Sequence, residues 1–147
     1  MNKIRYILVA EDDTDDKNLL QAVFDECQYD VPLQFVSNGL ELLQYLEQVK
    51  DNRSILHFPN FILLDLNMPK MDGRQALLEI KTDPAYRKIP IIVFSTTKNE
   101  DEINRCYELG ANTYIVKPSS YKDFLITIGT ITDYWLKSAA IPNSKLQ

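Results

Sequence analysis

Acidic side chains follow two apolar segments of this chain, at the point where each segment ends. Residues 4–10 are followed directly by Glu11 and Asp12, and residues 61–64 are followed by Asp65. Carboxylates that lie close together resist ionisation as their neighbours ionise, and a divalent cation removes this repulsion. Mg²⁺ prefers oxygen ligands, including one or two carboxylates. The pattern therefore predicts a Mg²⁺ site formed by Glu11, Asp12 and Asp65.

Two further polar residues stand at the ends of apolar segments. Ser95 follows residues 91–94, and Lys117 follows residues 113–116. A carboxylate can attack phosphorus and form an aspartyl phosphate, and Asp65 is the candidate nucleophile. Phosphoryl transfer needs the charge on the phosphoryl oxygens to be neutralised, which an ammonium and a hydroxyl can do. The pattern indicates phosphoryl transfer to Asp65, with Lys117 and Ser95 as donors.

A simpler interpretation is that some of these acids only cap a helix. Asp side chains satisfy the free N–H groups of a helix N-terminus, and we assign that role to Asp13. Capping could also account for Glu11 and Asp12 when they are considered alone. It accounts for neither Asp65 nor Lys117. A zinc site is not expected, because the sequence has no cluster of His or Cys.

The elements that must position these residues alternate between short apolar runs and amphipathic stretches. Strands are predicted at residues 4–10, 33–36, 61–64, 91–94 and 113–116. Helices are predicted at residues 14–27, around 42–49, from 73 onward, at 100–109 and from 121 to about 137. This alternation predicts an α/β fold, a parallel sheet with helices on both faces. Ligands of such sheets bind beyond the carboxyl ends of the strands, where the polar residues lie.

Length and composition favour one globular domain. The chain has 147 residues, of which 45% are hydrophobic, and a net charge of -5 argues against direct binding of nucleic acid. The two cysteines, Cys27 and Cys106, have no metal-binding spacing, and we expect a reducing, cytoplasmic setting. A membrane span is not expected, because no run of about 20 apolar residues is present.

Taken in order, these motifs resemble the receiver domain of two-component response regulators. The matching pieces are Glu11-Asp12, the run from Asp65 through Asn67 and Pro69 to Gly73, Ser95-Thr96, and Tyr114-Ile115-Val116-Lys117-Pro118. The resemblance covers residues 4–137. It implies a flavodoxin-like five-stranded parallel sheet with strand order 2-1-3-4-5, in a domain spanning residues 1–138 with a C-terminal tail at 139–147.

The same resemblance implies a role for each site residue. Asp65 would be the phosphoacceptor, and Lys117 would bind the phosphoryl group. Asp12 would be the more direct Mg²⁺ ligand of the acidic pair, with Glu11 acting through water. The backbone carbonyl of Asn67 would be a further metal ligand.

The resemblance also implies a switch. Ser95 would move toward the phosphoryl group, and Tyr114 would change rotamer with it. Asn67 and Thr97, each two residues past a key position, would tune the lifetime of the phosphorylated form. The peptide bond before Pro118 would be cis, a form that proline makes accessible.

These features predict a single-domain response regulator that accepts a phosphoryl group from a sensor histidine kinase. Residues 74–81, the Asp83-Pro84 turn and the Tyr134-Trp135-Leu136 segment resemble the small regulators paired with bacterial phytochromes. Expected partners are therefore a phytochrome-like kinase, a downstream histidine phosphotransfer protein, and a second copy of the chain bound through the last helix. The only expected catalysis is of its own phosphorylation and dephosphorylation.

Two other functions remain open at this point. The chain could be a receiver-like interaction module that is never phosphorylated. It could also be a Mg²⁺-dependent phosphatase that uses an aspartyl phosphate. Such phosphatases usually carry a second acid two residues after the nucleophile, where this chain has Asn67.

Overall fold

The five apolar segments form one parallel sheet. The computed structural model describes residues 5–53 and 55–142. The strands are β1 (Ile7–Ala10), β2 (Leu33–Val36), β3 (Phe61–Leu64), β4 (Ile91–Ser95) and β5 (Thr113–Val116). Their order is β2-β1-β3-β4-β5, with every neighbouring pair parallel. The predicted fold class and strand order are confirmed. Strand β1 is shorter than predicted, and Ile4 lies outside the described residues.

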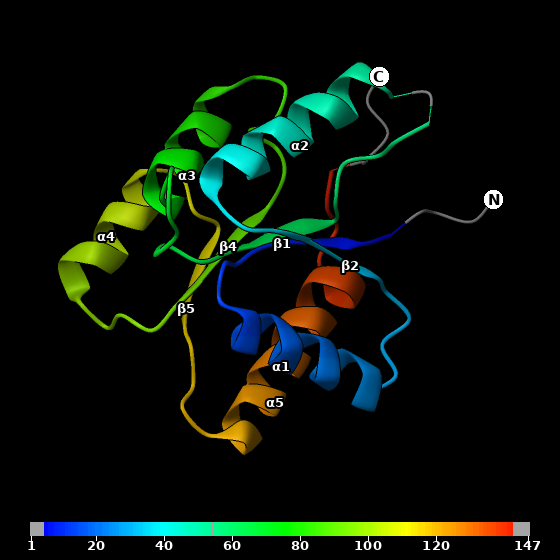
Figure 1. Cartoon of the computed structure of the whole chain (residues 1–147), viewed down its shortest axis with the longest axis vertical. Helices are drawn as coiled ribbons and strands as arrows, with labels where there is room; N and C mark the ends of the chain where they lie inside the picture. Colours follow the sequence, from blue (N-terminus) through cyan, green and yellow to red (C-terminus); the bar gives the residue numbers. More distant parts are fainter. Residues whose placement is uncertain (1–4, 54, 143–147) are drawn as a thin grey trace.

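Five helices cover the two faces of this sheet (Figure 1). They are α1 (Thr14–Glu26), α2 (Gly39–Asp51), α3 (Gly73–Thr82), α4 (Glu100–Glu108) and α5 (Tyr121–Asp133). Helices α1 and α5 lie on one face, whereas α2, α3 and α4 lie on the other. Among the described helices, none combines the length and apolar character needed to cross a membrane.

Each helix begins directly after a residue whose side chain accepts a hydrogen bond from a main-chain N–H group of the first turn. These capping residues are Asp13, Asn38, Asp72, Asn99 and Ser120. Such a cap stabilises a helix by about 1 kcal/mol. The capping role predicted for Asp13 is confirmed. Gly110, with a φ of 109°, follows α4 in the left-handed conformation that glycine adopts without strain.

The end of the last helix differs from the prediction. The α-helical part of α5 stops at Asp133, and Tyr134–Ser138 forms one π-helical turn, η1. In this turn the N–H of Ala139 donates a hydrogen bond to the carbonyl of Tyr134 at 2.7 Å. Trp135 packs against the ring of Phe61, 6.4 Å between centroids, at the start of β3. The wider turn thus ends the helix against the sheet.

The three central strands β1, β3 and β4 are buried on both faces, which explains why they are almost entirely apolar, whereas the edge strands β2 and β5 are partly exposed. Alternate strand residues, among them Leu8, Ala10, Ile62 and Leu64, pack under α2, α3 and α4. The intervening residues, among them Ile7, Val9, Phe61 and Leu63, pack under α1 and α5. Cys106 belongs to the first cluster and Cys27 borders the second, so the sheet separates the two free cysteines.

Candidate functional site

The register of the strands brings the predicted site residues to one edge of the sheet. Ala10 pairs with Leu64, so Glu11 and Asp65 leave the adjacent strands β1 and β3 at the same level. The N–H of Asp65 donates to the carbonyl of Ala10 at 3.0 Å. Between the ends of β4 and β5, the N–H of Lys117 donates to the carbonyl of Ser95 at 2.8 Å. Main-chain hydrogen bonds therefore fix the backbone positions from which these side chains extend.

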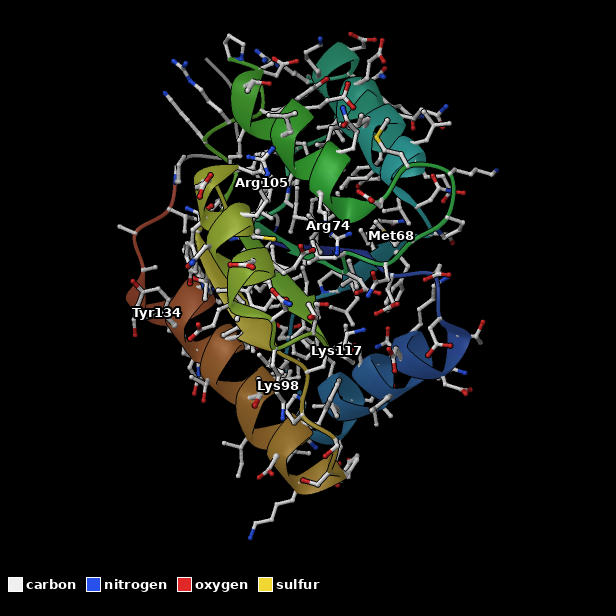
Figure 2. The ribbon with its side chains drawn as sticks, turned by 90° about the vertical axis from the view of Figure 1, so that its left-hand side faces the viewer. Met68, Arg74, Lys98, Arg105, Lys117 and Tyr134 are labelled. Carbon is white, nitrogen blue, oxygen red and sulfur yellow. The ribbon has the colours of Figure 1, made fainter. Side chains whose placement is uncertain are left out.

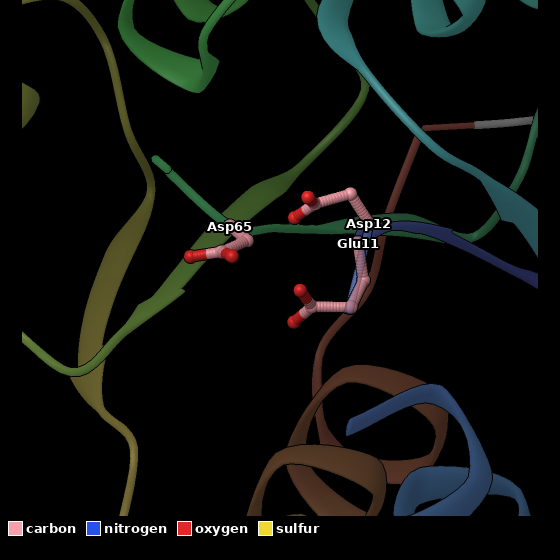
Figure 3. A group of neighbouring side chains, drawn as sticks. All are labelled: Glu11, Asp12 and Asp65. Carbon is pink, nitrogen blue, oxygen red and sulfur yellow. The ribbon is translucent and has the colours of Figure 1, made fainter. Parts of the chain in front are cut away.

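The carboxyl groups of Glu11, Asp12 and Asp65 point toward a common space (Figure 3). One oxygen from each residue lies within 4.8 Å of the others. Glu11 and Asp65 are buried, and Asp12 is exposed. Burial raises the pKa of the Glu11 carboxyl to about 7, although a hydrogen bond from Lys117 acts in the opposite direction. Clustered carboxylate oxygens, with two of the three groups buried, fit a hard divalent cation.

Lys117 reaches this cluster from the end of β5. Its Nζ atom lies 2.6 Å from Glu11 Oε1, 2.8 Å from Asp16 Oδ2 and 3.7 Å from Asp65 Oδ2. Burial alone would lower the pKa of Lys117, but the hydrogen bonds with Asp16 and Glu11 outweigh it and raise that pKa. The side chain is therefore a charged ammonium inside the site.

The predicted switch residues belong to β4 and β5, the two strands beyond β3 in the sheet. Ser95 is fully buried at the end of β4, and its Oγ atom accepts a long hydrogen bond of 3.5 Å from the N–H of Thr97. The buried side chain of Tyr114 donates its hydroxyl hydrogen to the carbonyl of Thr97 at 3.0 Å. Asn67 is exposed in the segment that leads from β3 to α3.

The sequence analysis missed one charged residue of the site. Asp16 lies in the first turn of α1 and forms an ion pair with Lys117. No spacing in the sequence pointed to it, because Asp12 precedes the N-terminal cap of α1 and the contact with Lys117 depends on how α1 packs against the sheet. The ring of Phe94 also contributes to the site, with its centroid 5.7 Å from the Lys117 ammonium.

One expectation about this segment is wrong. The described residues contain no cis peptide bond, so the bond between Lys117 and Pro118 is trans. The trans form is favoured before proline by about 0.5–1 kcal/mol unless the surroundings demand the cis form.

Comparison with known proteins identifies the family. The model of the response regulator receiver domain matches residues 7–128. Response regulator Rcp1 from a Synechocystis strain is 37% identical over 141 residues, which cover 96% of this chain and 95% of Rcp1. The matched range includes all five strands and the residues Glu11, Asp12 and Asp65.

Solved structures agree with this match. The phosphorylated cyanobacterial phytochrome response regulator RcpA superposes with a TM-score of 0.86 and 36% identity, covering 95% of this chain and 99% of RcpA. The Mn²⁺-bound form of Rcp1 gives a TM-score of 0.83 and 37% identity, covering 94% of this chain and 99% of that one. With its sheet order and its edge of acidic residues, the chain belongs to the response regulator receiver domain family and is similar to cyanobacterial phytochrome response regulators.

Proposed function

We propose that this protein is a single-domain response regulator that accepts a phosphoryl group on Asp65 from a sensor histidine kinase. One observation carries the proposal. Asp65 is buried at the carboxyl edge of the sheet, within 4.8 Å of two other carboxylates and with the Lys117 ammonium 3.7 Å away. A nucleophilic carboxylate, carboxylate oxygens that can bind a divalent ion, and the Lys117 ammonium therefore lie close together. Phosphoryl transfer to a carboxylate needs all three.

The reaction follows from this arrangement. An oxygen of Asp65 attacks phosphorus in the phosphohistidine of the kinase, and the P–N bond breaks, leaving its electron pair on the imidazole nitrogen. The product is an acyl phosphate on Asp65. During the transfer the ammonium of Lys117 donates to one phosphoryl oxygen and the hydroxyl of Ser95 to another, which lowers the barrier.

A divalent cation is part of the proposal. Glu11, Asp12 and Asp65, with the backbone carbonyl of Asn67, would hold Mg²⁺, and Glu11 would act through a water molecule. When bound, the cation neutralises charge on the phosphoryl oxygens. The cluster of carboxyl groups and the Mn²⁺-bound structure of the similar protein Rcp1 support a divalent ion here.

The acyl phosphate would act as a switch because it adds charge beside a buried hydroxyl. Ser95 would move toward the phosphoryl group, and the segment that follows β4 would move with it. Tyr114 is hydrogen-bonded to Thr97 in that segment and would change rotamer. The surface of α4, β5 and α5 would then differ between the two states, and Thr97 and Asn67 would tune the lifetime of the phosphorylated state.

The partners are proposed from similarity and from exposed surface. Similarity to RcpA, a cyanobacterial phytochrome response regulator, supports a phytochrome-like histidine kinase as the donor, and the transfer would take place in the cytoplasm. A histidine phosphotransfer protein would be a downstream acceptor. The apolar side chains of Ile126 and Tyr134 are 55% and 54% exposed, and Figure 2 shows Tyr134 at the surface. They support a homodimer through the C-terminal helix of a receiver domain at residues 1–138, followed by a tail at 139–147.

The test is phosphorylation by a small donor. Purified protein is incubated with phosphoramidate and Mg²⁺, and intact mass is followed. The wild type is expected to gain one phosphoryl group, and Asp65→Asn is expected to gain none. Asp15→Asn removes a nearby exposed carboxylate outside the cluster and should behave as the wild type does. Equal phosphorylation of Asp65→Asn would contradict the proposal, as would a wild type that takes up no phosphoryl group.

A further inference from the structure

The Lys117 ammonium makes its two short contacts away from the phosphoacceptor. Its distances to Glu11 and Asp16 are 2.6 and 2.8 Å, within hydrogen-bond range, whereas Asp65 is 3.7 Å away. An ammonium has three donors, and two of them are engaged by these carboxylates. Lys117 is therefore drawn toward α1, and the phosphoacceptor receives no hydrogen bond from it in this structure.

The surroundings of Lys117 make a carboxylate partner necessary. Its side chain is only 8% exposed, whereas that of Asp16 is 37% exposed. In Figure 2 Lys117 lies toward the middle of the molecule. The small cavity beside it is lined by the carboxylates of Glu11, Asp16 and Asp65 and otherwise by apolar side chains, among them Phe94 and Phe124. A buried charge is stable only when it is paired and hydrogen-bonded.

Glu11 cannot be the sole partner of Lys117 in the working protein. It is also a member of the three-carboxylate cluster, where its negative charge would stabilise the bound cation. The negative charge of Glu11 would then be divided between the bound cation and the Lys117 ammonium. Asp16 lies outside that cluster and has Lys117 as its ion-pair partner among the described residues.

We propose that Asp16 is a positioning residue that holds Lys117 in a withdrawn position, next to α1, until a phosphoryl group on Asp65 competes for the ammonium. Through this contact Asp16 sets how strongly the metal-bound site resists the arrival of an anion on Asp65. The inference rests on the proposed function, because the competing anion is the phosphoryl group on Asp65.

If Asp16 positions Lys117, removing the charge of Asp16 should change the affinities for the metal cation and for an anion on Asp65 in opposite directions. Without Asp16 the positive charge of Lys117 is less compensated, so a cation beside Glu11 and Asp65 is bound less tightly. The ammonium is then also free to reach an anion on Asp65, and one repelling negative charge is gone. Damage to the fold would instead weaken the binding of both ligands.

The experiment measures both ligands on the full chain. Mg²⁺ affinity is measured by calorimetry, and the affinity for trifluoroberyllate, a stand-in for the aspartyl phosphoryl group, is measured by ¹⁹F NMR at saturating Mg²⁺. For Asp16→Asn we expect Mg²⁺ to bind up to about tenfold more weakly and trifluoroberyllate up to about tenfold more tightly, as for one charge near a partly screened site. Asp15→Asn is the matched control, with the same charge change on an exposed neighbour.

Three outcomes decide the matter. Opposite shifts in Asp16→Asn, absent from Asp15→Asn, support the positioning role. Equal behaviour of the two variants, or a fall in both affinities for Asp16→Asn, overturns it while leaving the proposed function in place, provided that the wild type binds trifluoroberyllate and Asp65→Asn does not. A wild type that binds Mg²⁺ but no trifluoroberyllate overturns the proposed function itself, and the role of Asp16 with it.

Discussion

The hydroxyl of Tyr114 donates a hydrogen bond to the main-chain carbonyl oxygen of Thr97, at a distance of 3.0 Å. The bond joins β5 to the segment that follows β4. In the same segment the N–H of Thr97 points to the Oγ atom of Ser95. The inward position of Tyr114 and the position of the buried Ser95 hydroxyl are therefore coupled through one residue, which is what a switch at this edge of the sheet requires.

The first prediction concerns this hydrogen bond. Tyr114→Phe keeps the ring but leaves the Thr97 carbonyl without its partner, so the free energy of unfolding should fall by about 1 kcal/mol. Urea unfolding measures the change, and the m-value should stay constant because the same surface is exposed on unfolding. Tyr134→Phe, at an exposed tyrosine, is the control and should change stability by less than about 0.5 kcal/mol. Equal effects of the two substitutions would show that the Thr97 bond contributes nothing.

The fold could be predicted because the three central strands β1, β3 and β4 are buried on both faces. Apolar runs such as residues 61–64 are distinct from the amphipathic helices, and their alternation leaves few possible topologies. The positions of Glu11, Asp65 and Lys117 followed from the same reasoning, since the carboxyl ends of parallel strands meet at one edge. Here local sequence and tertiary structure agree.

Other features depend on tertiary contacts that a sequence pattern does not record. Asp16 enters the site because α1 packs at an angle that brings its first turn over Lys117, and no spacing rule gives that angle. The π-helical turn at Tyr134 depends on how Trp135 packs against the sheet, whereas the apolar stripe alone is also compatible with a continued α-helix.

The second prediction concerns Gly73, the first residue of α3. A Cβ atom at this position would collide with the main-chain carbonyl oxygen of Asp65 and lie 2.8 Å from the Cα atom of Leu66. Because backbone cannot move aside as a side chain can, Gly73→Ala should lower the free energy of unfolding by about 1–3 kcal/mol. It should also slow phosphorylation by phosphoramidate, because relief of the collision displaces Asp65.

A second glycine provides the comparison for this prediction. A Cβ atom on Gly129, within α5, would have the Tyr29 hydroxyl as its nearest neighbour, at 3.1 Å, and that atom ends a flexible side chain. Alanine is favoured over glycine in a helix interior by about 1 kcal/mol, so Gly129→Ala should raise stability by up to that amount. Thermal unfolding of both variants measures the contrast. If Gly73→Ala is as stable as Gly129→Ala, the close approach to Asp65 does not require glycine.

The third prediction is a pH dependence that arises at Lys81. Its ammonium donates to the carbonyls of Arg87 and Ile89 at 3.0 and 2.8 Å, and burial lowers the pKa of Lys81 from 10.5 to about 8. Between these values the unfolded chain binds more protons than the folded one, so this residue makes the free energy of unfolding rise with pH. Its contribution is fully present above pH 10.5 and is lost as the pH falls through about 8.

The measurement is a difference between variants, which removes the contribution of the tyrosines that also titrate in this range. Lys81→Met is compared with the wild type by urea unfolding at pH about 8 and about 10.5. The wild type should gain stability relative to Lys81→Met as the pH rises. Lys122→Met, which removes an exposed lysine from α5, is the control and should give a difference that is small at both pH values. A stability difference for Lys81→Met that does not change with pH would contradict the assignment.

The last prediction tests the proposed homodimer. Ile126 is 55% exposed on α5, and Tyr134, 54% exposed, follows directly after the same helix, so both side chains are available for an interface. Ile126→Lys would place a charge in the interface, so the dimer formed with Mg²⁺ and trifluoroberyllate should weaken about tenfold or more, the change given by about 1.4 kcal/mol. Light scattering reports the mass.

Leu40→Lys makes the same kind of change at a side chain 43% exposed on α2, on the opposite face of the sheet, and should leave the dimer intact. Both variants should still accept a phosphoryl group, since neither residue touches the acidic cluster. If the two lysine variants dimerise equally well, the C-terminal helix is not the interface.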